Sequence, residues 1–410
     1  MQLAAFIASR VAFNQQHSFS RFIIRLAMVA TILSVAVMIV AFGVTNGFQQ
    51  TISQKIFNFW GHLRVQHFQP QRVAVAEELP IEKNDTVVQV LQQTNNITSV
   101  NSFATKNAIL KTSETIEGIL FKGVESNYNF KQLQPFLQQG RWMQYPDSGY
   151  SNEIVLSAST ASQLQVKLGD ALLIYFIQND GTAPRARKLS ICGIYKTGIE
   201  EYDKLIALGD LRLVQRLNNW QPNQIGGYEI FIDDYKKMDA VNETIFYQLP
   251  KEWNSHTIKE VYPNIFDWLG LQNKTILLVL IIMTIVAVLN LVTCLIILVL
   301  ERTRMVGVLK ALGAPNKTVQ GVFLYQGAFI TGAGILLGNL LALLLIWLQQ
   351  RYGIIKLQEE MYYISKAVIE TEWWHFVVVN LGVFVVCLLV LLIPTIIVRK
   401  IQPVKAIQFR

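Results

Sequence analysis

Four long apolar stretches divide the chain, one near the N-terminus and three in its last third. We expect them to form transmembrane helices at residues 22–47, 273–300, 319–348 and 374–398. At a rise of about 1.5 Å per residue, each stretch is long enough to cross a hydrocarbon core of about 30 Å. Residues 48–272, between the first two stretches, have the composition of a soluble domain. The pattern predicts an α-helical membrane protein with four transmembrane helices, one plus three, and a large domain inserted between helices 1 and 2.

The inserted domain alternates between strand and helix patterns. Runs rich in β-branched and aromatic residues, bounded by turn residues, predict strands. They lie at 104–111, 115–123, 153–156, 171–177, 189–195, 205–208 and 228–232. Helical patterns lie at 157–168, 209–217, 234–249 and 262–271. We expect 171–177 and 189–195 to form a hairpin whose polar tip is a loop at 178–188. The domain is therefore predicted to be α+β, in two subdomains.

Basic residues near the ends of the apolar stretches predict the orientation of the chain. They gather in the leader 1–21, in the short loop 301–318 and in the tail 399–410, whereas glutamates outnumber basic residues in the loop 349–373. Both termini and the loop 301–318 are therefore expected in the cytoplasm, and the inserted domain outside it. The net charge of +8 follows from this bias at an anionic membrane surface, so it gives no reason to expect nucleic acid as a partner.

The leader and the composition add two expectations. Apolar residues recur at helical spacing beside Arg10, which favours an interfacial helix over residues 1–21, with an unstructured leader as the alternative. The chain is 52% hydrophobic and only 16% charged, as expected of a membrane protein. The inserted domain holds one cysteine, Cys192, so it must be stabilised by its own core rather than by an internal disulfide.

No catalytic constellation is visible in the sequence. It lacks a Gly-x-x-x-x-Gly-Lys-Ser/Thr loop for nucleotide phosphates, and its five histidines show no metal-binding spacing. We expect no cofactor, no metal and no catalytic residue. Any ATP hydrolysis would belong to a separate subunit, so the chain by itself is not an enzyme.

Four short segments are similar to motifs of one family. Residues 45–49 (Thr-Asn-Gly-Phe-Gln) look like its Met-Asn-Gly-Phe-Glu signature, with Thr and Gln as departures. Residues 153–156 with 168–170 resemble its strand–helix–Gly-Asp–strand segment. Residues 301–314 are similar to its loop after the second span, and 403–407 to its Pro-x-x-Ala-Leu tail. Over essentially its whole length, the chain resembles the lipoprotein-releasing LolC/LolE permeases of the FtsX/MacB-type ABC transporter superfamily.

The resemblance implies a function and a set of partners. It implies a permease subunit of the bacterial inner membrane, with the inserted domain in the periplasm. A LolD-like ATPase dimer would bind on the cytoplasmic side, and a second permease copy or paralogue would complete the membrane part. The complex would extract lipoproteins from membrane lipid and pass them to a LolA-like periplasmic carrier.

The loop 301–318 is the first candidate site. Apolar residues at spacings of three and four give it a short amphipathic helix, which Gly313 can end and Pro315 prevents from continuing. The resemblance implies that this helix couples the permease to the ATPase; the alternative is that it lies on lipid and the underside of the helices. The candidate coupling residues are Arg304, Met305, Val308, Leu309, Lys310, Leu312 and Gly313.

Two further sites rest on the resemblance. Spans 1 and 2 of paired permeases would enclose a cavity for acyl chains, although ordinary lipid-facing helices show the same residues. The cavity candidates are Met38, Phe42, Ile52, Phe59, Ile276, Leu280 and Met283. The hairpin tip occupies the position where one permease type recruits the carrier, and its default interpretation is a solvated loop. The carrier candidates are Pro184, Arg185 and Arg187.

Polar and small residues inside the spans have open roles. Gly334 and Gly338 form a Gly-x-x-x-Gly spacing that serves either packing within the chain or a subunit interface. Asn290, Asn339 and Asn380 are expected to form hydrogen bonds between helices.

Two other classes of protein remain as alternatives. One is a mechanotransmission or efflux permease of the same superfamily that drives a periplasmic partner. The other is a membrane-anchored scaffold or sensor, which would need neither an amphipathic cytoplasmic loop nor a glycine-rich third span.

Overall fold

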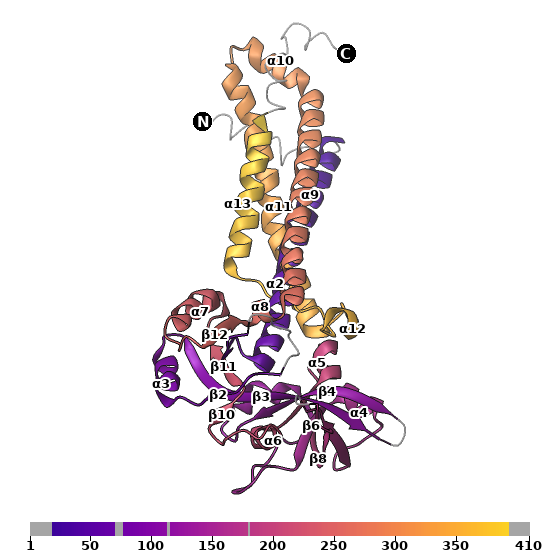
Figure 1. The fold of residues 1–410 in the computed structure, drawn as a ribbon. Helices are drawn as coiled ribbons and strands as arrows, with labels where there is room; N and C mark the ends of the chain where they lie inside the picture. Colours follow the sequence, from indigo (N-terminus) through magenta and orange to yellow (C-terminus); the bar gives the residue numbers. More distant parts are fainter. Residues whose placement is uncertain (1–18, 70–76, 113–114, 179–180, 393–410) are drawn as a thin grey trace. The chain divides into compact units, whose positions relative to one another are not determined.

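The protein forms two compact units (Figure 1). The computed structural model describes residues 19–69, 77–112, 115–178 and 181–392. The helical unit lies within 1–50, 268–356 and 366–410, and the sheet unit lies within 51–267 and 357–365. Most of the predicted leader helix (1–18 of 1–21) and the whole tail 399–410 lie outside the described residues.

Four helices of the described part are long and apolar enough to cross a membrane. They are α2 (Phe19–Trp60), α9 (Pro263–Glu301), α11 (Asn316–Tyr352) and α13 (Trp373–Val390). The first precedes the strands in the chain and the other three follow them. α2 continues well beyond the predicted end of the first span at residue 47, and α9 begins before the predicted start at 273. Two short helices, α10 (Thr303–Ala311) and α12 (Glu359–Tyr362), follow α9 and α11.

Glycines on α11 let it pack closely against α2. A Cβ atom at Gly334 would lie 2.8 Å from the side chain of Thr31, and one at Gly338 would lie 2.8 Å from Cβ of Val35. Such contacts need the bare backbone that glycine gives. The Gly-x-x-x-Gly spacing therefore serves packing within this chain.

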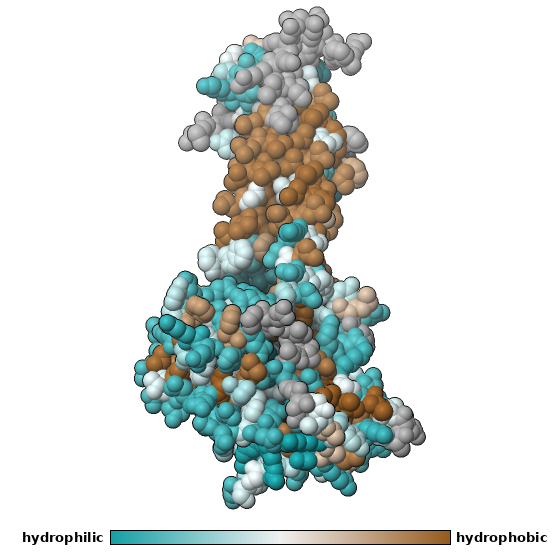
Figure 2. All heavy atoms as spheres, in the orientation of Figure 1, coloured by the Kyte–Doolittle hydropathy of each residue, from teal (hydrophilic) through white to brown (hydrophobic). Residues whose placement is uncertain are grey.

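Paired asparagines join α11 to α13. Nδ2 of Asn339 donates to Oδ1 of Asn380 at 3.1 Å, and Nδ2 of Asn380 donates to Oδ1 of Asn339 at 3.2 Å. The amides satisfy each other inside an apolar environment, as expected for polar residues in membrane helices. The middle part of the helical unit presents a broad apolar surface, brown in Figure 2.

The sheet unit is built on one ten-stranded sheet. Its strands and the separate pair β2 and β10 are β1 (Leu63–His67), β2 (Ile81–Glu82), β3 (Ile97–Lys111), β4 (Ile116–Val124), β5 (Leu137–Gly140), β6 (Glu153–Ser157), β7 (Ala171–Phe176), β8 (Arg185–Tyr195), β9 (Ile206–Asp210), β10 (Gln224–Ile225), β11 (Gly227–Ile232) and β12 (Trp253–Thr257). Besides α12, which also lies in this unit, its α-helices are α3 (Asp85–Gln93), α4 (Ala158–Gln163), α5 (Glu200–Leu205), α6 (Leu211–Leu217), α7 (Met238–Phe246) and α8 (Ile258–Val261).

Six of the strands close into a ring. The sheet runs β12-β1-β11-β3-β4-β9-β6-β8-β5, and β7 pairs with both β3 and β8. The strands β3, β4, β9, β6, β8 and β7 therefore form a small closed barrel, with β11, β1 and β12 extending from β3. Alternate residues point inward, and Phe121 meets Phe176 edge-on inside, with ring centroids 5.3 Å apart.

The sheet unit corrects three sequence expectations. It is one compact unit on a continuous sheet, not two subdomains. The helix expected at 157–168 is only α4, since the chain turns at Gln165, which has φ of +55°. The loop expected at 178–188 ends earlier, because Arg185–Lys188 pair in register with Leu173–Phe176 and belong to β8.

Candidate functional site

Helix α10 is a short helix with a defined end. The N–H of Ala314 donates to the carbonyl of Leu309 at 3.0 Å, and that of Gly313 donates to Lys310 at 3.0 Å. Gly313 has φ of +87°, which a residue with a side chain rarely adopts. This pair of bonds is a Schellman motif, so the glycine satisfies carbonyls that the helix end would otherwise leave unpaired.

The apolar residues of α10 divide between two sides. Met305 and Leu309 pack against a buried cluster that includes Leu298 and Phe323. On the other side, residues at helical spacing are exposed, and we call them the outer face of α10: Arg304, Val308, Ala311 and Leu312. The exposed fraction of Leu312 is 79%. The sequence predicts one apolar stripe, but only Met305 and Leu309 attach the helix to the unit, whereas Val308 and Leu312 are exposed.

The cavity candidates in the helical unit point into the bundle. Met38 is buried in the main cluster, and Leu280 and Met283 pack against the same cluster. Phe42 meets Trp374 edge-on, with ring centroids 5.4 Å apart. Ile276 is half-buried. Within this chain, most of these side chains contribute to the packing of the helices.

Two cavity candidates belong to the sheet unit. Ile52 and Phe59 are 0% and 1% exposed. Phe59 stacks on Tyr195 and Tyr202, with ring centroids 5.6 and 5.7 Å apart. The last part of α2 lies in the aromatic core of this unit, which explains the apolar spacing that suggested a lipid contact. Both residues are core residues and not part of a cavity.

The exposed apolar surface of the helical unit lies on other residues of α2 and α9. On α2 the exposed side chains follow one stripe at spacings of three and four: Phe22, Leu26, Val29, Leu33 and Val37. On α9 they include Leu278, Ile281, Ile282, Ile285 and Leu289. Only lipid, an apolar ligand or another chain can cover such surfaces in a membrane. The α2 stripe was readable from the sequence, because its spacing is regular.

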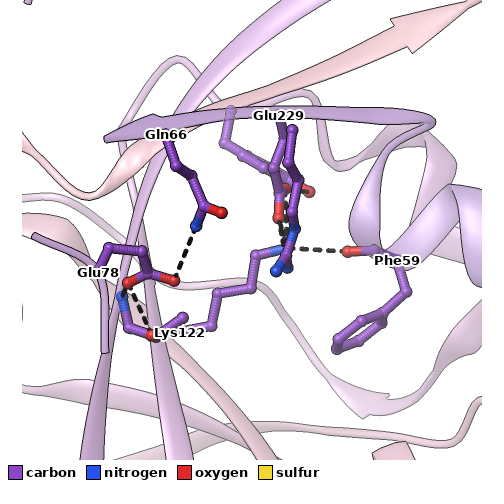
Figure 3. Close-up of polar contacts among 8 residues, drawn as sticks. Phe59, Gln66, Glu78, Lys122 and Glu229 are labelled. Carbon is purple, nitrogen blue, oxygen red and sulfur yellow. Dashed lines mark hydrogen bonds and ion pairs between the residues drawn. The ribbon is translucent and has the colours of Figure 1, made fainter. Parts of the chain in front are cut away.

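A buried charged cluster attaches the end of α2 to the sheet (Figure 3), and no local pattern in the sequence predicts it. Lys122 on β4 is fully buried. Its Nζ donates to Oε2 of Glu229 on β11 and to the carbonyl oxygen of Phe59, both at 2.8 Å. Nη2 of Arg64 on β1 lies 3.5 Å from Oε1 of Glu229. We call these three charged residues with the Phe59 carbonyl the α2 joint.

The physical chemistry of the joint explains its composition. The last carbonyls of a helix lack partners within the helix and carry partial negative charge, so a cation there is favourable. Trp60 adds its ring face, 4.6 Å from Nζ of Lys122 and 4.1 Å from the guanidinium of Arg64. Burial lowers the pKa of Lys122 to about 8, while Glu229 opposes that shift.

Among the described residues, no three His, Cys, Asp or Glu side chains gather as metal ligands would.

The carrier candidates fall on two kinds of position. Pro184 is exposed just before β8. Arg185 lies in β8, and its Nη1 donates to the carbonyl oxygen of Leu217 and to Oδ1 of Asn219, both at 3.0 Å. It therefore caps the C-terminal end of α6, a structural role. Arg187 is half-buried and donates to the carbonyl of Ala186 at 2.7 Å.

Beside the hairpin, one wall of the barrel carries exposed apolar and basic residues in one row. Lys111 pairs with Ile116 and with Leu173, and Leu173 pairs with Lys188. The exposed fractions of Ile116 and Leu173 are 63% and 41%. Gly118, in the next row, has nothing within 4 Å of its Cβ position. This wall is uncovered by the described residues.

Two family models match the chain. The MacB-like periplasmic core domain matches residues 26–245, which is more than half of the chain, and the FtsX-like permease C-terminal domain matches residues 277–403. Together they define a permease of the FtsX/MacB superfamily, a multi-pass protein of the inner membrane with a periplasmic core domain.

Curated relatives narrow the class. The chain is 24% identical to the lipoprotein-releasing system transmembrane protein LolE of Haemophilus influenzae, covering 96% of each. It is 22% identical to LolC of Neisseria meningitidis serogroup B, over 82% of this chain and 79% of that one. It is 21% identical to LolC of Xylella fastidiosa, over 97% and 96%. The chain belongs to the LolC/LolE family of ABC transporter permeases, as the sequence motifs predicted.

Proposed function

We propose that this chain is the permease subunit that extracts lipoproteins from the inner membrane and passes them to a periplasmic carrier. A separate LolD-like ATPase dimer in the cytoplasm would drive it. Both termini and α10 would face the cytoplasm, and the sheet unit the periplasm. The names of the LolC and LolE relatives and the arrangement of basic residues support this assignment.

The outer face of α10 is the observation that carries the proposal. Val308 and Leu312 are exposed on a helix of only nine residues, with Arg304 one turn before them. A helix this short is not stable alone in water, and α10 is held by its opposite side and its Schellman end. An anchored helix that presents an apolar pair to the cytoplasm suits docking into a groove of the ATPase.

The cargo site is proposed on the exposed stripes of α2 and α9. At about 0.8 kcal/mol per buried CH₂ group, the acyl chains of a lipoprotein resist extraction by tens of kcal/mol. If another permease copy or paralogue enclosed this apolar surface, the acyl chains could leave the membrane without being exposed to water. We therefore place the cargo contact on Leu33 and its stripe neighbours, not on the buried Met38.

The sheet unit would receive the motion and the carrier. α2 is one unbroken helix of 42 residues, and the α2 joint fixes its end to three strands. Movement of the last part of α2 would therefore act directly on the sheet. We propose the carrier contact at Pro184, Arg187 and the adjacent wall with Lys188, where basic and apolar side chains alternate.

The same joint also favours a second candidate. A permease that moves no lipid and drives a periplasmic partner mechanically would use the same attachment of α2 to the sheet. Lipoprotein extraction and mechanotransmission differ in whether lipid-anchored cargo is moved. Both would transmit movement from the membrane helices to the sheet unit.

Depletion of the protein in its native cell tests the proposal. Labelled outer-membrane lipoproteins are followed by membrane fractionation, with an unrelated inner-membrane permease depleted as the control. If the proposal holds, mature lipoproteins accumulate in the inner membrane before growth stops. Unchanged sorting, together with altered drug sensitivity or cell-wall turnover, would instead support the mechanical alternative.

A further inference from the structure

A short stretch between α11 and α13 belongs to the sheet unit, although its neighbours on both sides belong to the helical unit. This stretch is 357–365, and it contains α12. The N–H of Leu357 donates to the carbonyl of Ser365 at 3.1 Å, so its two ends are held together. The chain thus enters the sheet unit a third time, besides its passages along α2 and α9.

Three side chains of the sheet unit hold this stretch. Nζ of Lys55, on the last part of α2, donates to the carbonyl oxygen of Tyr363 at 2.7 Å. The hydroxyl of Tyr363 donates to Oε1 of Glu201 on α5 at 2.9 Å. Nζ of Lys196 lies 2.6 Å from Oε2 of Glu359. The contacts come from α2, from the turn between β8 and α5, and from α5 itself, so they hold the stretch from three directions.

The contacts differ in weight. The side chains of Lys196 and Glu359 are 40% and 29% exposed, and ion pairs this exposed contribute little. Lys55 is half-buried and binds a backbone oxygen. Removing this charged donor would leave the carbonyl oxygen of Tyr363 without its hydrogen bond. Lys55 therefore contributes most to holding residues 357–365 on the sheet unit.

The receiving turn is shaped in advance. The buried carboxylate of Asp203 accepts hydrogen bonds from the N–H and Oγ1 of Thr197 and from the N–H of Gly198, at 2.8 to 2.9 Å. Gly198 has φ of +77°, and a Cβ there would lie 2.6 Å from Oε1 of Glu359 and 2.9 Å from Nζ of Lys55. The positive φ favours glycine at this position, and any side chain there would also have to displace the ends of Glu359 and Lys55.

We propose that residues 357–365 form a tether that stays fastened to the sheet unit throughout the transport cycle. Through it, α11 and α13 act on the β8–α5 turn and on Lys55 of α2, by a route separate from the helices α2 and α9 themselves. The proposal rests on the proposed function in one respect, since it takes the cycle to be driven by a cytoplasmic ATPase.

Hydrogen exchange on the full complex with its ATPase, in lipid nanodiscs, tests the tether. Exchange of the amides of 357–365 is measured without nucleotide and with ATP plus vanadate. We expect the two rates to agree within about twofold. Lys55→Met should raise both about fivefold. Lys356→Met, which removes an exposed lysine of the same loop, should change neither.

The same variants are compared for lipoprotein released per ATP hydrolysed. Lys55→Met should lower this ratio at least threefold, with Lys356→Met as wild type. Exchange in the wild type that rises with ATP to the level of Lys55→Met would overturn the tether, as would faster exchange in Lys55→Met with unchanged release. If the wild type releases no lipoprotein, the proposed function fails, while the exchange rates still judge whether the tether stays fastened.

Discussion

The Nζ atom of Lys122 lies 2.8 Å from the carbonyl oxygen of Phe59, so a fully buried cation on strand β4 holds the last turn of helix α2. Glu229 balances that cation from β11. Lys122 can be charged although it is buried, because the carbonyl at the helix end and the carboxylate together replace the water molecules that would otherwise surround its ammonium group.

Lys122→Met should destabilise the sheet unit by about 3–5 kcal/mol, because it leaves the buried Glu229 carboxylate with only the longer contacts, to Arg64 at 3.5 Å and to the Tyr128 hydroxyl at 3.4 Å. Chemical unfolding followed by tryptophan fluorescence measures the loss. Lys131→Met removes an exposed lysine of the same unit and should shift stability by less than about 0.5 kcal/mol. Equal stability of the two variants would contradict the importance of the joint.

His62 should make the sheet unit sensitive to mild acid. Burial lowers the pKa of His62 to about 4, whereas an unfolded histidine titrates near 6.5. The unfolded chain therefore binds the extra proton first, and stability falls as pH drops from about 6.5 to 4, by up to about 3 kcal/mol. Unfolding free energy measured across this range should be flatter in His62→Gln. An unchanged slope in that variant would assign the acid sensitivity to other groups.

Leu312→Asp should abolish co-purification of the ATPase while leaving membrane insertion intact, because Leu312 is exposed on the outer face of α10. Ile354→Asp is the matched control, since Ile354 is a 65% exposed apolar residue elsewhere in the helical unit. Pull-down from detergent extracts compares the two. Retention of the ATPase by Leu312→Asp would rule out the coupling assignment.

Gly338→Val should weaken the packing of α11 on α2, because its side chain would collide with Val35 and with the backbone of Ile32. Overpacking of this kind costs about 1–3 kcal/mol. Gly332→Val is the control on the same helix, since nothing lies within 4 Å of its Cβ position. Thermal stability in detergent should fall for Gly338→Val alone; a similar loss in both would point to a general effect of valine on the helix.

A photoreactive amino acid at Leu33 should crosslink to lipoprotein in membranes, since this side chain is 52% exposed on the α2 stripe. The same probe at Val35, which is 0% exposed and faces α11, should not. Mass spectrometry of the crosslinked products identifies the partner. Crosslinks to phospholipid alone at Leu33 would move the cargo site elsewhere.

The sequence predicted the features that depend on local pattern. The apolar stretches, the end of α10 at Gly313 and most strands follow from hydrophobic runs and turn residues, which act over a few positions. A polar side chain inside a membrane helix needs a partner, which predicts hydrogen bonds between helices for the asparagines, and Asn339 and Asn380 form them with each other.

The features that the sequence did not predict depend on contacts distant in the chain. Ile52 and Phe59 have the apolar spacing of a lipid-facing helix, and only the fold shows that the sheet unit buries them. Arg185 looked like a basic loop residue until its pairing in β8 placed it at the end of α6. Lys122 and Glu229 are 107 residues apart, and no local pattern links two such charges.

The closed ring of strands reduces the number of exposed sheet edges. A sheet edge with unpaired backbone groups can recruit strands from other chains. In the ten-stranded sheet the outermost strands are β12 and β5, which are only five and four residues long. The fifteen-residue β3 is paired along both sides where the barrel closes. The sheet therefore offers few unpaired backbone groups at which a strand from another chain could add and begin an aggregate.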